Sequence, residues 1–134
     1  MKLECEPGEY TDSPTVWTGT IVFSRRSWLA MKDLIGHLGE VFELHGAASG
    51  FFLFNPLVNE LVLSRRANVK RFDDGRLMFV LNPILRRDSA EGLIVGMLKE
   101  APGSEVYVGQ PFVDAWRRGG FVGLAFDPVP TAEE

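Results

Sequence analysis

The chain has 134 residues, of which 46% are hydrophobic, so that one domain spanning residues 1–134 can bury a core without a disulfide or a structural metal. Its net charge is −4, and the excess acid lies at the ends: residues 1–12 and 127–134 carry −3 each, and residues 13–126 carry +2. A nucleic-acid contact would therefore have to use interior arginines, and the two acidic tails are expected to be less ordered than the rest.

The composition favours a soluble, cytoplasmic protein. Cys5 is the only cysteine, so an internal disulfide is impossible. The acidic start of the chain is unlike the basic start of a signal peptide. The longest stretch without a charged side chain, residues 44–59, is too short and too mixed to cross a bilayer.

The first predicted elements are a strand and a helix. Residues 15–23 are rich in β-branched and aromatic side chains and predict a strand, in which Gly19 marks a bulge or a close approach. A helix follows, because hydrophobic residues then recur every three or four positions, namely at Trp28, Met31, Ile35 and Leu38. Ser24 or Ser27 can cap its start, and Gly39 is its expected stop.

The middle of the chain predicts mainly strands. Residues 40–45 and 50–55 are strand-like, and residues 57–65 form a further apolar segment. Strands at 69–72 and 76–81 flank a turn made by Asp73, Asp74 and Gly75. Asp74 and Gly75 suit the positive φ values of a tight hairpin.

The last third contains one open choice. Residues 88–99 combine a possible N-cap with two internal glycines, so a helix and an extended chain are both open there. Residues 105–109 predict a strand. A short helix follows around Phe112 and Trp116, with Arg117 and Arg118 in its last turn, Gly119 as its C′ residue and a final strand at 121–126.

These elements predict an α+β fold. Its sheet should be mostly antiparallel, with one longer helix near the N-terminus and a short helix before the last strand.

Residues that could carry catalysis are few. His37 and His45 lie in no motif with the spacing of a metal pair or of a nucleophile with its base. The glycines near residue 120 follow a helix and do not form a phosphate loop. We therefore predict no enzyme, no metal and no cofactor. A ligand-binding or enzymatic domain at either histidine is the weakest alternative, and it requires a deep pocket where the histidine faces a carboxylate.

Paired arginines make the main alternative, a small nucleic-acid-binding domain. The basic residues concerned are Arg25, Arg26, Arg65, Arg66, Arg86, Arg87, Arg117 and Arg118, with Lys70 and Arg71. Each pair lies at the end of an element or in a strand where charge would face solvent, and acidic residues lie close by in sequence. Nucleic acid is therefore an unlikely partner unless the pairs form one contiguous basic face.

From Arg26 onward, the order of features resembles a family of bacterial polymorphic-toxin immunity proteins, the myxobacterial type of immunity domain. The resemblance lies in WLAMKDLIGHLGEVFEL (28–44), FFLFN (51–55), VKRFDDGRLMFV (69–80) and VYVGQPFVDAWRRGGFVGLAFDPV (106–129). It implies a non-enzymatic protein that binds the toxin encoded by an adjacent gene and blocks it. Leu63 and Ala67 stand where the family often carries an acidic residue and a serine, which leaves the class of toxin open.

A protein that blocks a basic toxin would use carboxylates to speed association and a few aromatic anchors for affinity. The candidate partner-binding residues are Glu40, Glu43, Asp73, Asp74 and Asp114, with Trp116 if it is exposed.

Overall fold

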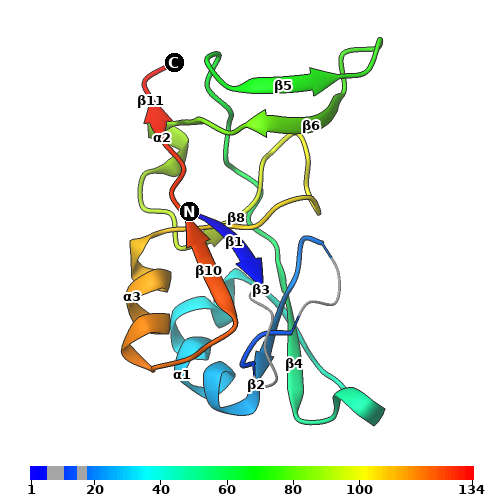
Figure 1. The fold of residues 1–134 in the computed structure, drawn as a ribbon, viewed down its shortest axis with the longest axis vertical. Coiled ribbons are helices and arrows are strands. Elements are labelled where there is room, and N and C mark those ends of the chain that lie inside the picture. The colour runs from blue at the N-terminus through cyan, green and yellow to red at the C-terminus, as the bar shows by residue number, and fades with distance from the viewer. Residues whose placement is uncertain (6–10, 15–17) are drawn as a thin grey trace.

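The computed structural model describes residues 1–5, 11–14 and 18–134. Its elements confirm the predicted α+β fold, with mostly antiparallel sheets, a longer helix near the N-terminus and a helix before the closing strand of the largest sheet. Figure 1 shows the longer helices and most of the strands in the lower part of the molecule, and a hairpin that stands out at the top.

The described strands form four small sheets. The largest has the order β10-β1-β9-β8 and consists of Leu124–Asp127, Lys2–Cys5, Tyr107–Val108 and Val95–Gly96. The second has the order β2-β4-β3 and consists of Ile21–Ser24, Phe51–Pro56 and Gly39–Glu43. The other two are the β5–β6 hairpin, Asn68–Arg71 with Leu77–Asn82, and the parallel pair of β11, Thr131–Ala132, with β7, Leu85–Arg86.

Helix α1, Arg25–Ile35, begins as the sequence predicts. The Ser24 hydroxyl oxygen caps it by accepting a hydrogen bond from the Ser27 N–H at 3.3 Å. The α-helix ends at Ile35, and the 3₁₀ turn Gly36–Leu38 leads into β3. The helical stretch therefore stops at Gly39 as expected, although its last turn is 3₁₀, and Gly39 is also the first residue of β3. A Cβ on Gly39 would lie 2.3 Å from the Asn55 carbonyl oxygen, so close strand pairing explains this glycine.

The predicted strand at residues 15–23 is shorter in the structure. Residues 15–17 lie outside the described residues, residues 18–19 form a turn, and β2 begins at Ile21. The close approach expected at Gly19 is confirmed, since its φ is +81° and a Cβ there would lie 2.5 Å from the Gly103 carbonyl oxygen.

The β5–β6 hairpin is confirmed, but its turn uses one positive φ value instead of two. Gly75 has φ +89°, and Asp74 keeps a negative φ. The Gly75 N–H donates to the Phe72 carbonyl, and the Phe72 N–H donates to the Arg76 carbonyl, both at 2.9 Å. This pattern is a three-residue loop closed by a glycine bulge, which needs only one left-handed residue.

Residues 88–99 are mostly extended. Helix α2, Arg87–Ala90, makes a single turn, Gly92 follows with φ +72°, and the chain then enters β8. The two internal glycines therefore favour the extended alternative.

Helix α3, Gln110–Arg118, has the predicted basic last turn. Its end differs by one residue from our expectation. Gly119 has φ −75° and is the C-cap, and Gly120 takes the left-handed conformation with φ +67°. Gly120 is therefore the C′ residue that stops the helix.

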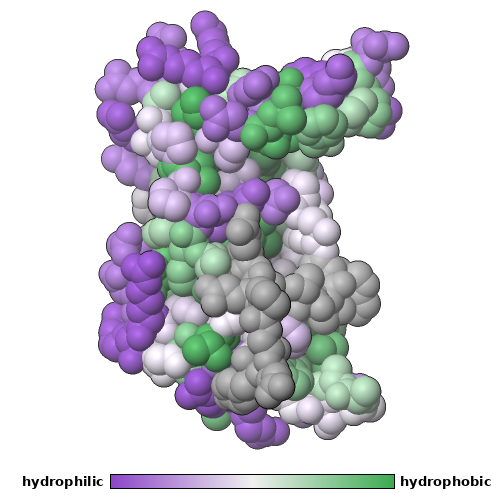
Figure 2. Space-filling view, in the orientation of Figure 1, coloured by the Kyte–Doolittle hydropathy of each residue, from purple (hydrophilic) through white to green (hydrophobic). Residues whose placement is uncertain are grey.

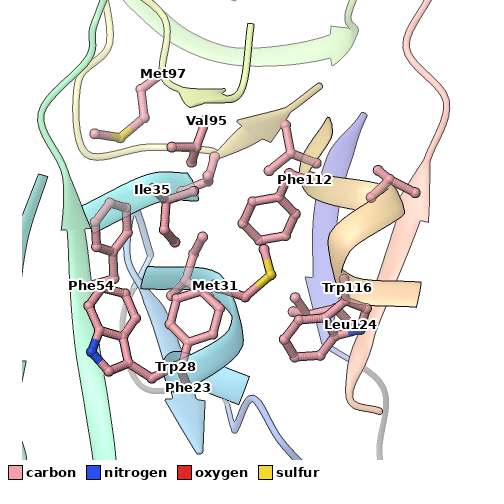
Figure 3. Packing of buried hydrophobic residues seen from close by; sticks show 14 residues of the cluster. Phe23, Trp28, Met31, Ile35, Phe54, Val95, Met97, Phe112, Trp116 and Leu124 are labelled. Carbon is pink, nitrogen blue, oxygen red and sulfur yellow. The ribbon is translucent and has the colours of Figure 1, made fainter. Parts of the chain in front are cut away.

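An aromatic cluster between α1, α3 and β2–β4 forms the main core (Figure 3). Phe23 lies at its centre, with its ring centroid 5.6 Å from that of Trp28 and 6.1 Å from that of Trp116. Phe54 and Phe112 complete the ring contacts at 6.4 Å each. A smaller buried cluster lies below the hairpin and consists of Leu61, Leu85, Leu98 and Tyr107.

Each of the two acidic ends contributes a strand to a sheet. β1 pairs with β10, and β11 pairs with β7. The carbonyl oxygen of Glu134 accepts hydrogen bonds from the Ser64 hydroxyl and the Arg65 N–H.

Candidate interaction surfaces

The acidic candidates occupy three separate places. Glu40 and Glu43 lie on β3, Asp73 and Asp74 lie in the turn at the tip of the β5–β6 hairpin, and Asp114 lies on α3. Figure 1 shows the hairpin tip and α3 far apart. All five side chains are exposed. The fold therefore does not join them into one acidic surface.

Some of these carboxylates already have partners. Asp74 accepts hydrogen bonds from the Arg76 N–H at 3.0 Å and from Arg76 Nε at 2.6 Å. Asp114 accepts one from Gln110 Nε2 at 2.8 Å, one helical turn away. An exposed pair of this kind contributes little to stability, but it lowers the attraction of its carboxylate for a basic partner.

Trp116 is not available to a partner. Its exposed fraction is 2%, and its ring centroid lies 5.2 Å from that of Phe121. The apolar face of α3 that it shares with Phe112 and Val113 packs into the core. Burial of the anchor therefore removes Trp116 from the candidate set.

β3 is an exposed edge strand. It pairs with β4 on one side only, and none of the strands described in the structure pairs with its outer edge. Val41 and Phe42 are 43% and 51% exposed, although they are large apolar residues on opposite faces of the sheet. Glu40 and Glu43 flank them, so the strand offers an acidic residue at each end and two apolar residues between.

The β5–β6 hairpin is the most hydrophobic exposed feature. Figure 2 shows hydrophobic side chains gathered along it. Phe72, Met78, Phe79 and Leu81 are between 41% and 58% exposed. None of these residues is among the candidates that the sequence predicted. The signal for this surface lies in residues 77–81, LMFVL, where apolar residues do not alternate with polar ones. In a two-stranded ribbon, such a run must leave apolar side chains uncovered on one face.

A small cavity lies at the base of this hairpin. Its volume is about 190 Å³, and β6 forms one wall while residues 98–107 form another. The polar groups on its lining come from Lys2, Ser104, Glu105 and Tyr107. Together with the exposed residues of β6, the cavity makes an apolar surface with a recess of side-chain size.

Because Tyr107 is buried, we expect the protein to be less stable in alkali. Burial, with the negative charge of Glu105 as a second cause, raises the pKa of Tyr107 from 10.0 to about 12. Above pH 10 the unfolded chain loses this proton while the folded chain keeps it, so the free energy of unfolding should fall by about 2 to 3 kcal/mol between pH 10 and 12. Urea unfolding across this range checks the result. The Tyr107→Phe variant should lack this part of the decline, and equal declines in both proteins would contradict the assignment.

The arginine pairs fall into two groups at opposite ends of the molecule. Arg65, Arg66, Arg86 and Arg87 line two adjacent cavities of about 350 and 370 Å³ near the C-terminus, and Glu133 and Glu134 line both of these cavities. The other pairs lie at the start of α1 and the end of α3, in the lower part of Figure 1.

The group near the C-terminus is largely compensated by acidic residues. Arg87 Nη1 lies 3.3 Å from a Glu133 carboxylate oxygen, and Arg86 Nη2 lies 2.6 Å from one of Asp88. This arrangement weakens the local positive potential that a nucleic-acid backbone would need.

His37 and His45 are both exposed, and neither borders the cavities described above. In residues 1–5, 11–14 and 18–134, no three histidine, cysteine or acidic side chains are grouped so that they could hold a metal ion. Within the same residues, no helix has both the length and the apolar character needed to cross a membrane.

Comparison of the chain with protein-family models, curated proteins and solved structures finds no match in any of the three. The surfaces described above are therefore the structural basis for a functional proposal.

Proposed function

We propose that this protein is an immunity protein that binds a cognate bacterial toxin and neutralises it by stoichiometric, non-catalytic inhibition. The observation that carries the proposal is the β5–β6 hairpin, which holds four large apolar side chains in solvent on a ribbon that projects from the body of the protein. Exposed apolar groups that lie together in this way are typical of a surface that a partner covers.

The hairpin has the parts of a protein interface. Its apolar centre is bordered by charged side chains such as Lys70 and Arg71, which matches the arrangement of an apolar core with a polar rim. The recess of about 190 Å³ beside Phe79 has the size to accept one large side chain from the partner. Anchors seated in such recesses supply most of the affinity in many complexes.

The proposal is tested by co-expression with the product of the adjacent gene. The chain should restore growth to cells that make that product, and the two proteins should purify as a stable complex. Unchanged toxicity together with no complex would refute the proposal.

A single substitution on the hairpin should weaken the complex. Phe79→Ala removes a half-exposed ring from the proposed interface, and we expect the dissociation constant to rise about 10- to 30-fold, the usual effect of an aromatic anchor. Leu29→Ala is the matched control, because Leu29 is 54% exposed on α1 and lies away from the hairpin. Calorimetry on both variants, with urea midpoints to confirm folding, makes the comparison. Equal affinities for the two would place the interface elsewhere.

Nucleic-acid binding through paired arginines is the second candidate, favoured by the convergence of four arginines near the C-terminus. It requires binding to DNA or RNA that weakens steeply with salt. We expect no such binding at physiological salt, because Glu133, Glu134 and Asp88 offset the arginines.

A further inference from the structure

We propose that the outer edge of β3 binds an extended, basic segment of the partner as an additional strand. This inference rests on the proposed function for the identity of the partner, which is the toxin. The complementary segment has a basic residue, two apolar residues and a second basic residue in succession.

The main chain of β3 has unused hydrogen-bonding groups. The Leu44 N–H donates to the Phe51 carbonyl and the Leu57 N–H donates to the Leu38 carbonyl, both at 2.9 Å. In the unbroken antiparallel register between β3 and β4, every second residue faces the partner strand, so Glu40 and Phe42 make the remaining ladder bonds. The N–H and C=O groups of Val41 and Glu43 therefore point outward, and no described residue bonds to them.

This edge has little of the usual protection against another strand. Edge strands are commonly blocked by charged side chains, especially lysine, by proline, by a bulge or by a covering element. The two glutamates of β3 would repel an acidic strand but not a basic one. β3 contains no lysine or proline, and its pairing with β4 shows no bulge. Glu40, Val41, Phe42 and Glu43 are all exposed, so both faces of the strand are open. An added strand would extend the row Val22–Leu53–Phe42, in which the first two residues are buried.

The charges of β3 select the added strand. Glu40 and Glu43 are its only charged residues, and they lie on opposite faces because they are three positions apart. The Asn55 side-chain amide donates a hydrogen bond to Glu40 Oε1 at 3.3 Å, and this donor is neutral. Within the described residues, no ion pair compensates the charge of either glutamate. Opposite charges directly across two strands attract and like charges repel. The sequence Glu-Val-Phe-Glu has the same pattern in both directions, so the complement suits a parallel or an antiparallel strand.

A peptide tests the edge without the toxin. The probe is the end-capped peptide Thr-Lys-Val-Val-Lys-Thr, and the matched control carries glutamate in place of both lysines. At about 1 mM, the lysine peptide should shift the NMR signals of Val41 and Glu43 and slow their amide exchange at least severalfold, while the glutamate peptide should not. Absence of these changes, or changes confined to another surface, would overturn the inference.

Charge reversal and proline variants sharpen the test. The double variant Glu40→Lys/Glu43→Lys should reverse the preference, and bind the glutamate peptide about tenfold more tightly than the lysine peptide. Val41→Pro removes only an outward N–H, so the protein should fold but lose the peptide. Phe42→Pro is the matched control, since it removes an inward N–H and should lower stability. Unchanged peptide binding by Val41→Pro would contradict strand addition.

The toxin complex separates this inference from the proposed function. If the toxin binds Val41→Pro and the natural chain equally, the edge inference fails and the proposed function stands. If the lysine peptide binds at β3 but no toxin is neutralised, the proposed function fails and the basic-strand site stands.

Discussion

Asparagine at position 12 is expected to lower the free energy of unfolding by about 3 kcal/mol, which is a large part of the stability of a domain of this size. Asp12 is fully buried. Its carboxylate accepts hydrogen bonds from the Ser24 hydroxyl at 2.6 Å, from Arg26 Nε and Nη2 at 2.9 and 2.8 Å, and from the Val122 N–H at 3.0 Å. An asparagine amide would turn an NH₂ group toward some of these donors and leave them unpaired.

Asp12 holds several segments of the chain together, so its replacement should cost more stability than the loss of one ion pair. Its main-chain oxygen accepts a hydrogen bond from the Ser24 N–H at 2.7 Å, and its own N–H donates to the Val122 carbonyl at 2.8 Å. Asp12 thus joins the segment before β2, the cap of α1 and the segment before β10. Arg26 is half exposed, with 51% of its side chain open to solvent, so the estimate lies at the low end for a broken buried ion pair.

Urea and thermal unfolding measured by circular dichroism check this prediction. We expect the melting temperature to fall by roughly 10 °C. Asp33→Asn is the matched control, because Asp33 is an exposed aspartate on α1 and its loss should change stability by less than about 0.5 kcal/mol. If Asp12→Asn unfolds at the same urea concentration as the control, the buried network does not stabilise the fold as described.

The predictions that succeeded rest on neighbours in sequence. The apolar spacing of α1, its Ser24 cap and the turn of the β5–β6 hairpin all depend on residues within a few positions of one another. At the end of α3 the error is a shift of one residue, because the left-handed conformation falls on Gly120 in place of Gly119. Local rules identify the element well, but its last residue depends on packing.

Asp12 could not be predicted in the same way. By sequence it belongs to an acidic end of the chain, and we counted it as tail charge. Its partner Val122 is 110 residues away, so only the folded chain brings the two together. When the hydrogen-bond partners of a carboxylate lie far away in sequence, the local sequence does not show whether that carboxylate is buried or exposed.

The candidate site was predicted in part for a similar reason. Glu40 and Glu43 were expected on a strand, and the structure places them on the exposed edge strand β3. Whether a strand lies at an edge depends on the order of strands in the sheet, which local patterns do not determine. Trp116 was expected as an anchor only if exposed, and the structure buries it. An aromatic residue is equally common in a core and in an interface, so its burial depends on what packs against α3.

Alanine at position 109 is expected to lower the free energy of unfolding by about 3 kcal/mol or more, because the backbone leaves no room for a methyl group. A Cβ on Gly109 would lie 1.7 Å from the Leu93 carbonyl oxygen. The conformation itself is acceptable to alanine, with φ −94° and ψ 177°. The cost therefore comes from forcing two main-chain segments apart. That movement would break the hydrogen bond of 3.0 Å from the Gly109 N–H to the Ile94 carbonyl and disturb the start of α3.

Gly36→Ala is the matched control for this close approach. A Cβ on Gly36 would meet no atom within 4 Å, and its helical φ of −56° suits alanine. We therefore expect Gly36→Ala to keep or raise stability by up to about 1 kcal/mol. Urea unfolding compares the two variants, and loss of soluble protein for Gly109→Ala alone agrees with the prediction. Equal stabilities of Gly109→Ala and Gly36→Ala would contradict the prediction. The segments around Gly109 and Leu93 could then move apart at little cost in free energy.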